Sequence, residues 1–210
     1  MSLEARLEQV FSQTDAAGSR EAYDDWAESY DRDMLGAEAE YVAPQIACEQ
    51  LARRLGDARI PTASVLDAGC GTGLVGVQLS KAGIKDIEGI DLSKNMLRVA
   101  AKTRVYGTLE VVDMSGPLPG ATNAYDAAIC VGTMTQGHVG PGAFAELVRV
   151  VKPGGYVVST VRQTIWESNG YKNTVEGLCE EKKAKLLSAG AEEVSRGQGL
   201  QIILVVLEVL

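Results

Sequence analysis

The sequence lacks the cysteine patterns of disulfide-rich and zinc-binding proteins, and it lacks long hydrophobic runs. Its four cysteines, Cys48, Cys70, Cys130 and Cys179, lie far apart and form no CxxC pair. This spacing is typical neither of a zinc site nor of a dense disulfide framework, so we expect reduced thiols, a cytoplasmic protein and no bound metal. No apolar run approaches the roughly 20 residues that span a bilayer, and MSLEARLEQV carries acids where a secretory signal would be apolar. We therefore expect no membrane segment.

Basic charge is also scarce. The chain has 28 acidic and 20 basic residues, a formal net charge of -8, and a single histidine, His138. An acidic protein repels the phosphate backbone of nucleic acids, whose binding depends on Lys and Arg. Long nucleic acid is therefore not an expected partner or substrate.

The composition that remains is that of one ordinary domain. Of 210 residues, 46% are hydrophobic and 23% are charged, which is typical of compact proteins. Tyr23, Trp26, Ala27 and Tyr30 fall at helical spacing and predict an amphipathic helix with an aromatic face, followed by a second helix over about 37–55. We expect residues 1–60 to form a helical cap on a core of residues 61–210, within one domain overall.

From residue 63 short apolar runs alternate with helical stretches. The strand-like runs are 63–68, 86–91, 108–113, 125–131 and 156–161, and the helical stretches between them are 74–83, 94–102 and 142–152. Strand and helix in alternation predict a parallel sheet covered on both faces.

The order changes after the fifth run. A helix is expected over about Thr174 to Ser188, ending at Gly190, and then two strand-like runs, 191–196 and 201–209, are joined only by GQGL. So short a link holds no crossover helix, so these two strands must be antiparallel. The predicted fold class is α/β: a Rossmann-like three-layer sandwich with a seven-stranded, mostly parallel sheet, one antiparallel C-terminal strand and an N-terminal helical extension.

The first strand leads into a glycine loop, LDAGCGTG. Gly69, Gly71 and Gly73 give GxGxG, whereas a dinucleotide fingerprint needs a third glycine where this chain has Leu74. Asp67, two residues before the first glycine, is expected at the tip of the strand, at the mouth of the loop, where it would repel a pyrophosphate. Both features disfavour an NAD-dependent oxidoreductase. They suit S-adenosylmethionine, which has no phosphate and carries positive groups.

Two more acids end the next strands. Asp91 ends the second run, where a carboxylate can accept hydrogen bonds from both ribose hydroxyls, and Asp113 ends the third, where it can accept from an adenine amino group beside the Met114 amide. A single Asp after a strand is often only a turn former or a helix cap. Three acids that end three successive strands, with glycines at the first, favour a nucleoside site.

Apolar and backbone groups complete this expected site. Leu92 and Met96 supply flexible apolar cover, and Gly69 and Gly71 let the backbone approach the methionine half of the ligand. The amides that open the helix at 72–74 are expected to favour its carboxylate.

These motifs resemble a known family. LDAGCGTG, IEGIDLSKNML and VVDM are similar to the cofactor motifs of class I S-adenosylmethionine-dependent methyltransferases, and the likeness runs from about Tyr23 to Gly155. YDDWAESYD, DAGCGTGLVG and CVGTMTQGHVGPGAFAELVRVVKPGG resemble the Williams-Beuren-syndrome-region methyltransferase-like proteins. The resemblance implies S-adenosyl-L-methionine as cofactor and S-adenosyl-L-homocysteine as product, but not the substrate. The expected cofactor-binding residues are Tyr23, Trp26, Tyr30, Asp67, Gly69, Cys70, Gly71, Asp91, Leu92, Met96, Asp113, Met114 and Val131.

The acceptor side is expected after the fourth strand, in VGTMTQGHVGPG (131–142). This segment is not the Asn/Asp-Pro-Pro-Tyr motif of enzymes that methylate nucleic-acid amino groups. His138 is the candidate general base near neutral pH, and a loop histidine satisfied by the backbone is the alternative. Tyr30 is the second catalytic candidate.

The aromatic helix face has two interpretations. Tyr23, Trp26 and Tyr30 either close over the cofactor as a lid or pack in the core. Met34 and Trp166 are weaker candidates for walls of the acceptor pocket. The predicted function is methyl transfer to a small molecule; the alternatives are a protein methyltransferase and a catalytically silent protein that binds S-adenosylmethionine.

Overall fold

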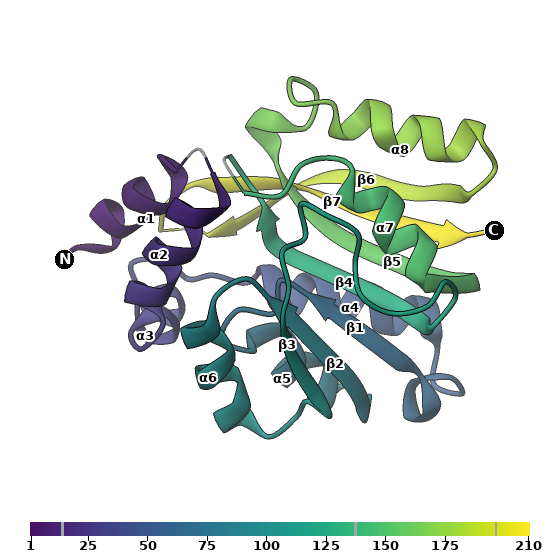
Figure 1. Ribbon diagram of the computed structural model, residues 1–210, viewed down its shortest axis with the longest axis horizontal. Helices are drawn as coiled ribbons and strands as arrows, with labels where there is room; N and C mark the ends of the chain where they lie inside the picture. Colours follow the sequence, from purple (N-terminus) through teal and green to yellow (C-terminus); the bar gives the residue numbers. More distant parts are fainter. Residues whose placement is uncertain (14, 137, 196) are drawn as a thin grey trace.

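A computed structural model shows one sheet with helices on both faces (Figure 1). The structure describes residues 1–13, 15–136, 138–195 and 197–210. Gly137, in the expected acceptor segment, and Arg196, at the end of the predicted strand 191–196, therefore lie outside the described residues. None of the helices that the structure describes has the length and the hydrophobicity that a transmembrane span requires.

The sheet confirms the predicted fold class. Its seven strands run in the order β3-β2-β1-β4-β5-β7-β6. Only β7 is antiparallel to its neighbours, β5 and β6, and the other described pairings are parallel. The strands are β1 Ser64–Ala68, β2 Asp86–Asp91, β3 Thr108–Val111, β4 Tyr125–Met134, β5 Val151–Arg162, β6 Ala184–Ser195 and β7 Leu200–Val209.

Helices cover the sheet because side chains alternate along each strand. Val65 and Ile129 face a buried cluster that includes α4 and α5, whereas Leu66 and Ala128 face a second cluster under α7 and α8. The helices are α1 Leu3–Phe11, α2 Ala16–Trp26, α3 Tyr30–Leu35, α4 Ala43–Leu55, α5 Leu74–Lys81, α6 Lys94–Thr103, α7 Ala143–Val150 and α8 Tyr171–Glu180, with short 3-10 turns at Ile60–Thr62 and Gln163–Ile165.

The first three helices gather at the end of the sheet toward which the β4 arrow points (Figure 1). Val10 and Trp26 from these helices belong to the same buried cluster as Val131 and Ile202 from the strands. Helix α4 instead packs against β4, β5 and α5. The division of the chain at residue 60 stays a prediction.

The predicted N-terminal helices have different limits. The second begins at Ala43 rather than at 37, because Pro44 occupies its first turn, where a missing amide is tolerated. The aromatic helix is interrupted: α2 ends at Trp26 and α3 begins at Tyr30. The Trp26 indole and the Ser29 hydroxyl both donate to Oδ2 of Asp33, at 2.9 and 2.8 Å, and these bonds stabilise the intervening turn.

The largest error lies near the C-terminus. The helix predicted over 174–188 is α8, which ends at Glu180, and residues from Ala184 onward form β6. Gly190 does not end a helix but pairs with Leu204 in the strand. The long antiparallel pairing with β7 overrides the helical propensity of this lysine- and leucine-rich segment. Smaller shifts are that β4 extends to Met134, that β5 already begins at Val151, and that β3 ends at Val111.

Candidate functional site

A cavity opens at the carboxyl ends of β1, β2 and β4, with α2 along one side. This is where parallel sheets of this kind bind ligands, at the point where the strand order reverses. Eleven of the predicted site residues line it: Tyr23, Tyr30, Gly69, Gly71, Asp91, Leu92, Met96, Asp113, Met114, Val131 and His138.

The glycine loop forms one wall of this cavity. Gly69 and Gly71 have positive φ angles, 76° and 54°, in the left-handed region that favours glycine. A Cβ atom at Gly69 would clash with the Thr133 hydroxyl, whereas one at Gly71 would meet nothing within 4 Å. The loop backbone therefore faces open space at Gly71, which fits the close approach expected for a ligand.

Asp91 connects this loop to the turn after β2. Its Oδ2 accepts a hydrogen bond from the Gly71 amide at 2.9 Å, and its Oδ1 accepts one from the Ser93 amide at 2.8 Å. Burial raises the pKa of Asp91, although these amides act in the opposite direction. Each carboxylate oxygen keeps a second lone pair at the cavity wall for a hydroxyl donor.

The far wall carries the second acid. Asp113 is exposed and lines the cavity beyond β3, and the buried Met114 lies beside it. The hydroxyl and the amide of Ser115 donate to Asp113 and lower its pKa, so it is a carboxylate at neutral pH. The pKa of Asp91 is raised and that of Asp113 is lowered because Asp91 is buried to a greater extent than the exposed Asp113.

Asp67 is not at the mouth of the loop. Its side chain is 0% exposed and does not line the cavity. Alternation along β1 places residue 67 on the same face as Val65, where Oδ2 of Asp67 accepts a hydrogen bond from the Tyr106 hydroxyl at 2.6 Å. Burial raises the pKa of Asp67 to about 7. The predicted repulsion of a pyrophosphate by Asp67 is therefore wrong, and the argument against a dinucleotide rests on Leu74.

Three other expected contacts are also absent from the lining of this cavity. Trp26 is 1% exposed and packs in the core, and Cys70 is buried beneath the loop near Gly89. Residues 72–74 do not line the cavity either: the Gly73 amide donates to the Cys70 carbonyl, and the Thr72 hydroxyl donates to Asp31. The proposed carboxylate site at the start of α5 is thus not supported.

His138 does face the cavity, but its surroundings differ from those of a neutral-pH base. Its Nδ1 contacts the Thr135 hydroxyl, and its Nε2 is buried without a hydrogen-bond partner among the described residues. Its ring centroid lies 5.4 Å from that of Tyr23. Burial lowers the pKa of His138 to about 4, so the ring is neutral at pH 7.

The two tyrosines of the aromatic face reach the same cavity. Tyr30 packs edge-on against Trp26 at 4.8 Å between centroids, and its ring centroid lies 6.4 Å from that of Tyr23. Burial raises the pKa of both phenols, so they remain neutral donors. Met34 lies instead in a neighbouring cavity, and Trp166 packs against the cluster on the opposite face of the sheet.

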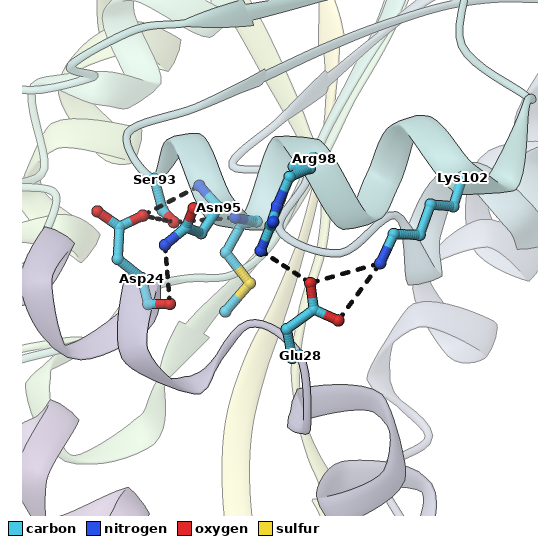
Figure 2. A network of polar contacts seen from close by, with 7 residues as sticks. Asp24, Glu28, Ser93, Asn95, Arg98 and Lys102 are labelled. Carbon is cyan, nitrogen blue, oxygen red and sulfur yellow. Dashed lines mark hydrogen bonds and ion pairs between the residues drawn. The ribbon is translucent and has the colours of Figure 1, made fainter.

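Polar contacts hold the aromatic helix on α6 (Figure 2). Oδ1 of Asp24 accepts hydrogen bonds from the Ser93 hydroxyl at 2.6 Å and the Asn95 amide at 3.0 Å, at the first turn of α6. Further along, Glu28 pairs with Arg98 at 2.8 Å and with Lys102 at 3.3 Å. Because Ser93 follows Asp91 by two positions, the Asp24 contact fixes Tyr23 relative to Asp91.

Sequence reasoning missed several cavity residues. Ala16, Ser19 and Arg20 lie on α2 within two turns before Tyr23, so extending the helical spacing upstream would have found them. Ser93 and Val112 also line the cavity and sit beside predicted residues, whereas Gly132, Thr133 and Val139 lie within the predicted acceptor segment 131–142. Their lining positions depend on loop conformation, for which the sequence carries no periodic signal.

Comparison of the sequence with known proteins identifies the family of this chain. Residues 65–155 match a family described as "Methyltransferase domain". The human methyltransferase-like protein 27 (Homo sapiens) is 35% identical over 173 residues, which cover 82% of this chain and 69% of the human protein. A malonyl-[acyl-carrier protein] O-methyltransferase of Buchnera aphidicola subsp. Baizongia pistaciae is 34% identical over 122 residues, 57% of this chain and 49% of that protein.

A solved structure shares the fold. The magnesium protoporphyrin IX methyltransferase of Synechocystis PCC 6803, with S-adenosylmethionine bound, superposes with a TM-score of 0.62, covering 99% of this chain and 91% of that one. At 15% sequence identity this likeness concerns the fold alone.

Proposed function

The chain belongs to the S-adenosylmethionine-dependent methyltransferases, and from that premise we propose that the cavity beside α2 binds the cofactor and that methyl transfer is to a small-molecule acceptor. When bound, the cofactor supplies a methyl group on a positively charged sulfur. The acidic chain, with a net charge of -8, and the helix along the cavity support a small acceptor rather than a nucleic acid.

The observation that carries the proposal is the Asp91 carboxylate at the wall, already oriented by the Gly71 and Ser93 amides. We propose that Asp91 accepts from the ribose hydroxyls. Asp113 and the Met114 amide bind the adenine ring, and Gly71 leaves room for the methionine half. Leu92 and Met96 exclude water from the nucleoside.

His138 and Tyr30, on the acceptor side of the cofactor cavity, are both neutral. We propose that Nε2 of His138 accepts a hydrogen bond from the acceptor and that Tyr30 donates one. A pKa near 4 makes His138 a weak base, but a hydroxyl oxygen becomes far more acidic as it gains a methyl group. His138 can therefore take that proton during transfer, while orientation of the acceptor supplies much of the rate.

Calorimetry with S-adenosylhomocysteine tests the cofactor site. We expect Asp91→Asn to weaken binding by roughly 10–100-fold, since a charged acceptor of two hydrogen bonds is lost. Asp86→Asn is the matched control, because Asp86 is the exposed residue at the opposite end of the same strand. Binding of NAD with no binding of S-adenosylhomocysteine would overturn the proposal.

Turnover is tested separately. The protein is incubated with S-adenosylmethionine and pools of small metabolites, and release of S-adenosylhomocysteine is measured. Release that depends on a pool supports a small acceptor; release with protein extracts alone would favour a protein acceptor. Tight binding of S-adenosylmethionine without release of S-adenosylhomocysteine from any pool would favour the alternative of a catalytically silent binding protein.

A further inference from the structure

A second cavity lies beside the cofactor cavity, under α1. Three residues line both: Tyr23, Tyr30 and Gly132. Thr135, whose hydroxyl contacts Nδ1 of His138, lines the second cavity as well. The second cavity thus begins at the proposed acceptor side of the cofactor site.

The walls of this cavity are mainly apolar. Side chains from α1, α3 and β7 surround it, among them Leu7, Phe11, Met34 and Ile202. Among the described residues of its lining, Arg162 is the one charged side chain, and none is acidic. A group bound there meets one positive charge among mainly apolar side chains.

Among the described residues, Arg162 forms no ion pair. Its guanidinium carbon lies 4.1 Å from the centroid of the Phe11 ring, and Nη1 is buried without a hydrogen-bond partner among the described residues. Glu4 and Glu8 line an adjoining groove together with Arg162, but neither forms an ion pair with it. An unpaired buried donor is costly, and an anionic ligand would satisfy it.

We propose that the second cavity is the acceptor site and that Arg162 binds a carboxylate of the acceptor, so that the substrates are small apolar carboxylic acids. This inference rests on the proposed methyl transfer. A guanidinium matches a carboxylate through two parallel hydrogen bonds, whereas a phosphate dianion calls for a second cation, which the described lining lacks.

The size of the cavity agrees with a small group. Its volume is about 40 Å³. A cavity needs roughly 10–15 Å³ to hold one water, so this one holds about three water-sized groups, which is the size of a carboxylate. The rest of a larger acceptor would extend toward Gly132 and the cofactor cavity.

Trp26 makes binding measurable, because it lines the second cavity. In a Trp166→Phe background it is the only tryptophan of the chain. We expect butyrate to change Trp26 emission in the protein saturated with S-adenosylhomocysteine, and butyramide, its neutral counterpart, to bind more than tenfold more weakly. Arg162→Gln should weaken butyrate binding more than tenfold, and Arg162→Lys by less.

Arg59→Gln is the matched control. Arg59 also lies over an aromatic ring, 5.6 Å from the centroid of Tyr156, and donates to the Gly154 carbonyl, but it does not line the second cavity. Its butyrate affinity should equal that of the background protein. Arg162→Lys, which retains a cation, keeps the comparison informative if Arg162→Gln folds poorly.

Three results would overturn the inference: equal binding of butyrate and butyramide, unchanged butyrate affinity in a folded Arg162→Gln variant, or binding of inorganic phosphate in preference to butyrate. Catalysis gives a further test, in which metabolite pools are separated on an anion exchanger. The acceptor should be in the retained, anionic fraction. Methyl transfer only to compounds of the unretained fraction would also overturn the inference. Calorimetry with S-adenosylhomocysteine separates the two proposals. If the parent protein does not bind S-adenosylhomocysteine, the proposed cofactor site itself is contradicted; if it binds but the Arg162 predictions fail, only the acceptor site is contradicted.

Discussion

At the level of single residues, the buried carboxyl of Asp67, hydrogen-bonded to the partly buried Tyr106, links pH to stability. Burial raises the pKa of Asp67 to about 7 in the folded protein, against 3.8 for a free carboxyl. The folded state therefore binds more protons than the unfolded state between these values, so this residue makes the protein less stable as pH rises from about 4 to 7. We expect Asp67→Asn to lose this contribution to the pH dependence of stability. Between about pH 4 and 7, the difference in unfolding free energy between wild type and variant should therefore change by up to roughly 4 kcal/mol.

Urea unfolding of both proteins at a series of pH values measures this difference. Asp126→Asn is the control, since Asp126 is paired with Lys152 at 3.0 Å and its pKa is lowered. A difference between wild type and Asp67→Asn that stays constant across the series would contradict the buried, raised carboxyl.

His138 allows a direct measurement because it is the only histidine of the chain. In a tag-free protein the Cε1 proton of this imidazole gives a single resonance. We expect it to titrate with a midpoint near 4 rather than 6.5, because burial disfavours the imidazolium. Unfolding in urea should return the midpoint to about 6.5. A folded-state midpoint above 6 would place the ring in water and remove the neutral acceptor from the proposed mechanism.

At the level of elements, the contact between α2 and α6 sets the position of the aromatic face. Asp24 accepts from the Ser93 hydroxyl and the Asn95 amide at the first turn of α6. We expect Asp24→Ala to cost about 1 kcal/mol of stability, as loss of a similar capping contact does, and to weaken S-adenosylhomocysteine binding several-fold as Tyr23 loses its support. Thermal unfolding and calorimetry measure the two effects.

Glu28→Ala is the control at the same interface. The side chains of Glu28, Arg98 and Lys102 are each 61% exposed, and exposed ion pairs contribute little. We expect near-unchanged affinity in this variant. An equal loss in both variants would show that general electrostatics, rather than the Asp24 contact, holds the helix.

The elements also show what the sequence can predict. The strands β1, β2 and β4, the glycine loop and Asp91 follow from local patterns, since alternation and glycine spacing occur within one segment. The first part of strand β6, residues 184–188, was predicted as helix because its pairing with β7 is non-local, whereas the strand-like run 191–196 and its antiparallel partner 201–209 were predicted. Asp67 was misplaced because Tyr106, its partner, lies far along the chain, and the isolation of Arg162 depends on which distant side chains surround it.

At the level of the whole molecule, helices α1 to α3 and the sheet share one buried cluster, so we expect them to unfold together. Emission of Trp26, in the Trp166→Phe background, reports on the N-terminal helices, and far-ultraviolet circular dichroism reports on the whole chain. The two thermal transitions should coincide. S-adenosylhomocysteine at 100 times its Kd should raise both midpoints by roughly 5–10 °C, because it adds about 2.7 kcal/mol to the folded state. An earlier transition of Trp26, with a ligand shift seen by only one probe, would mean that the N-terminal helices open independently of the core.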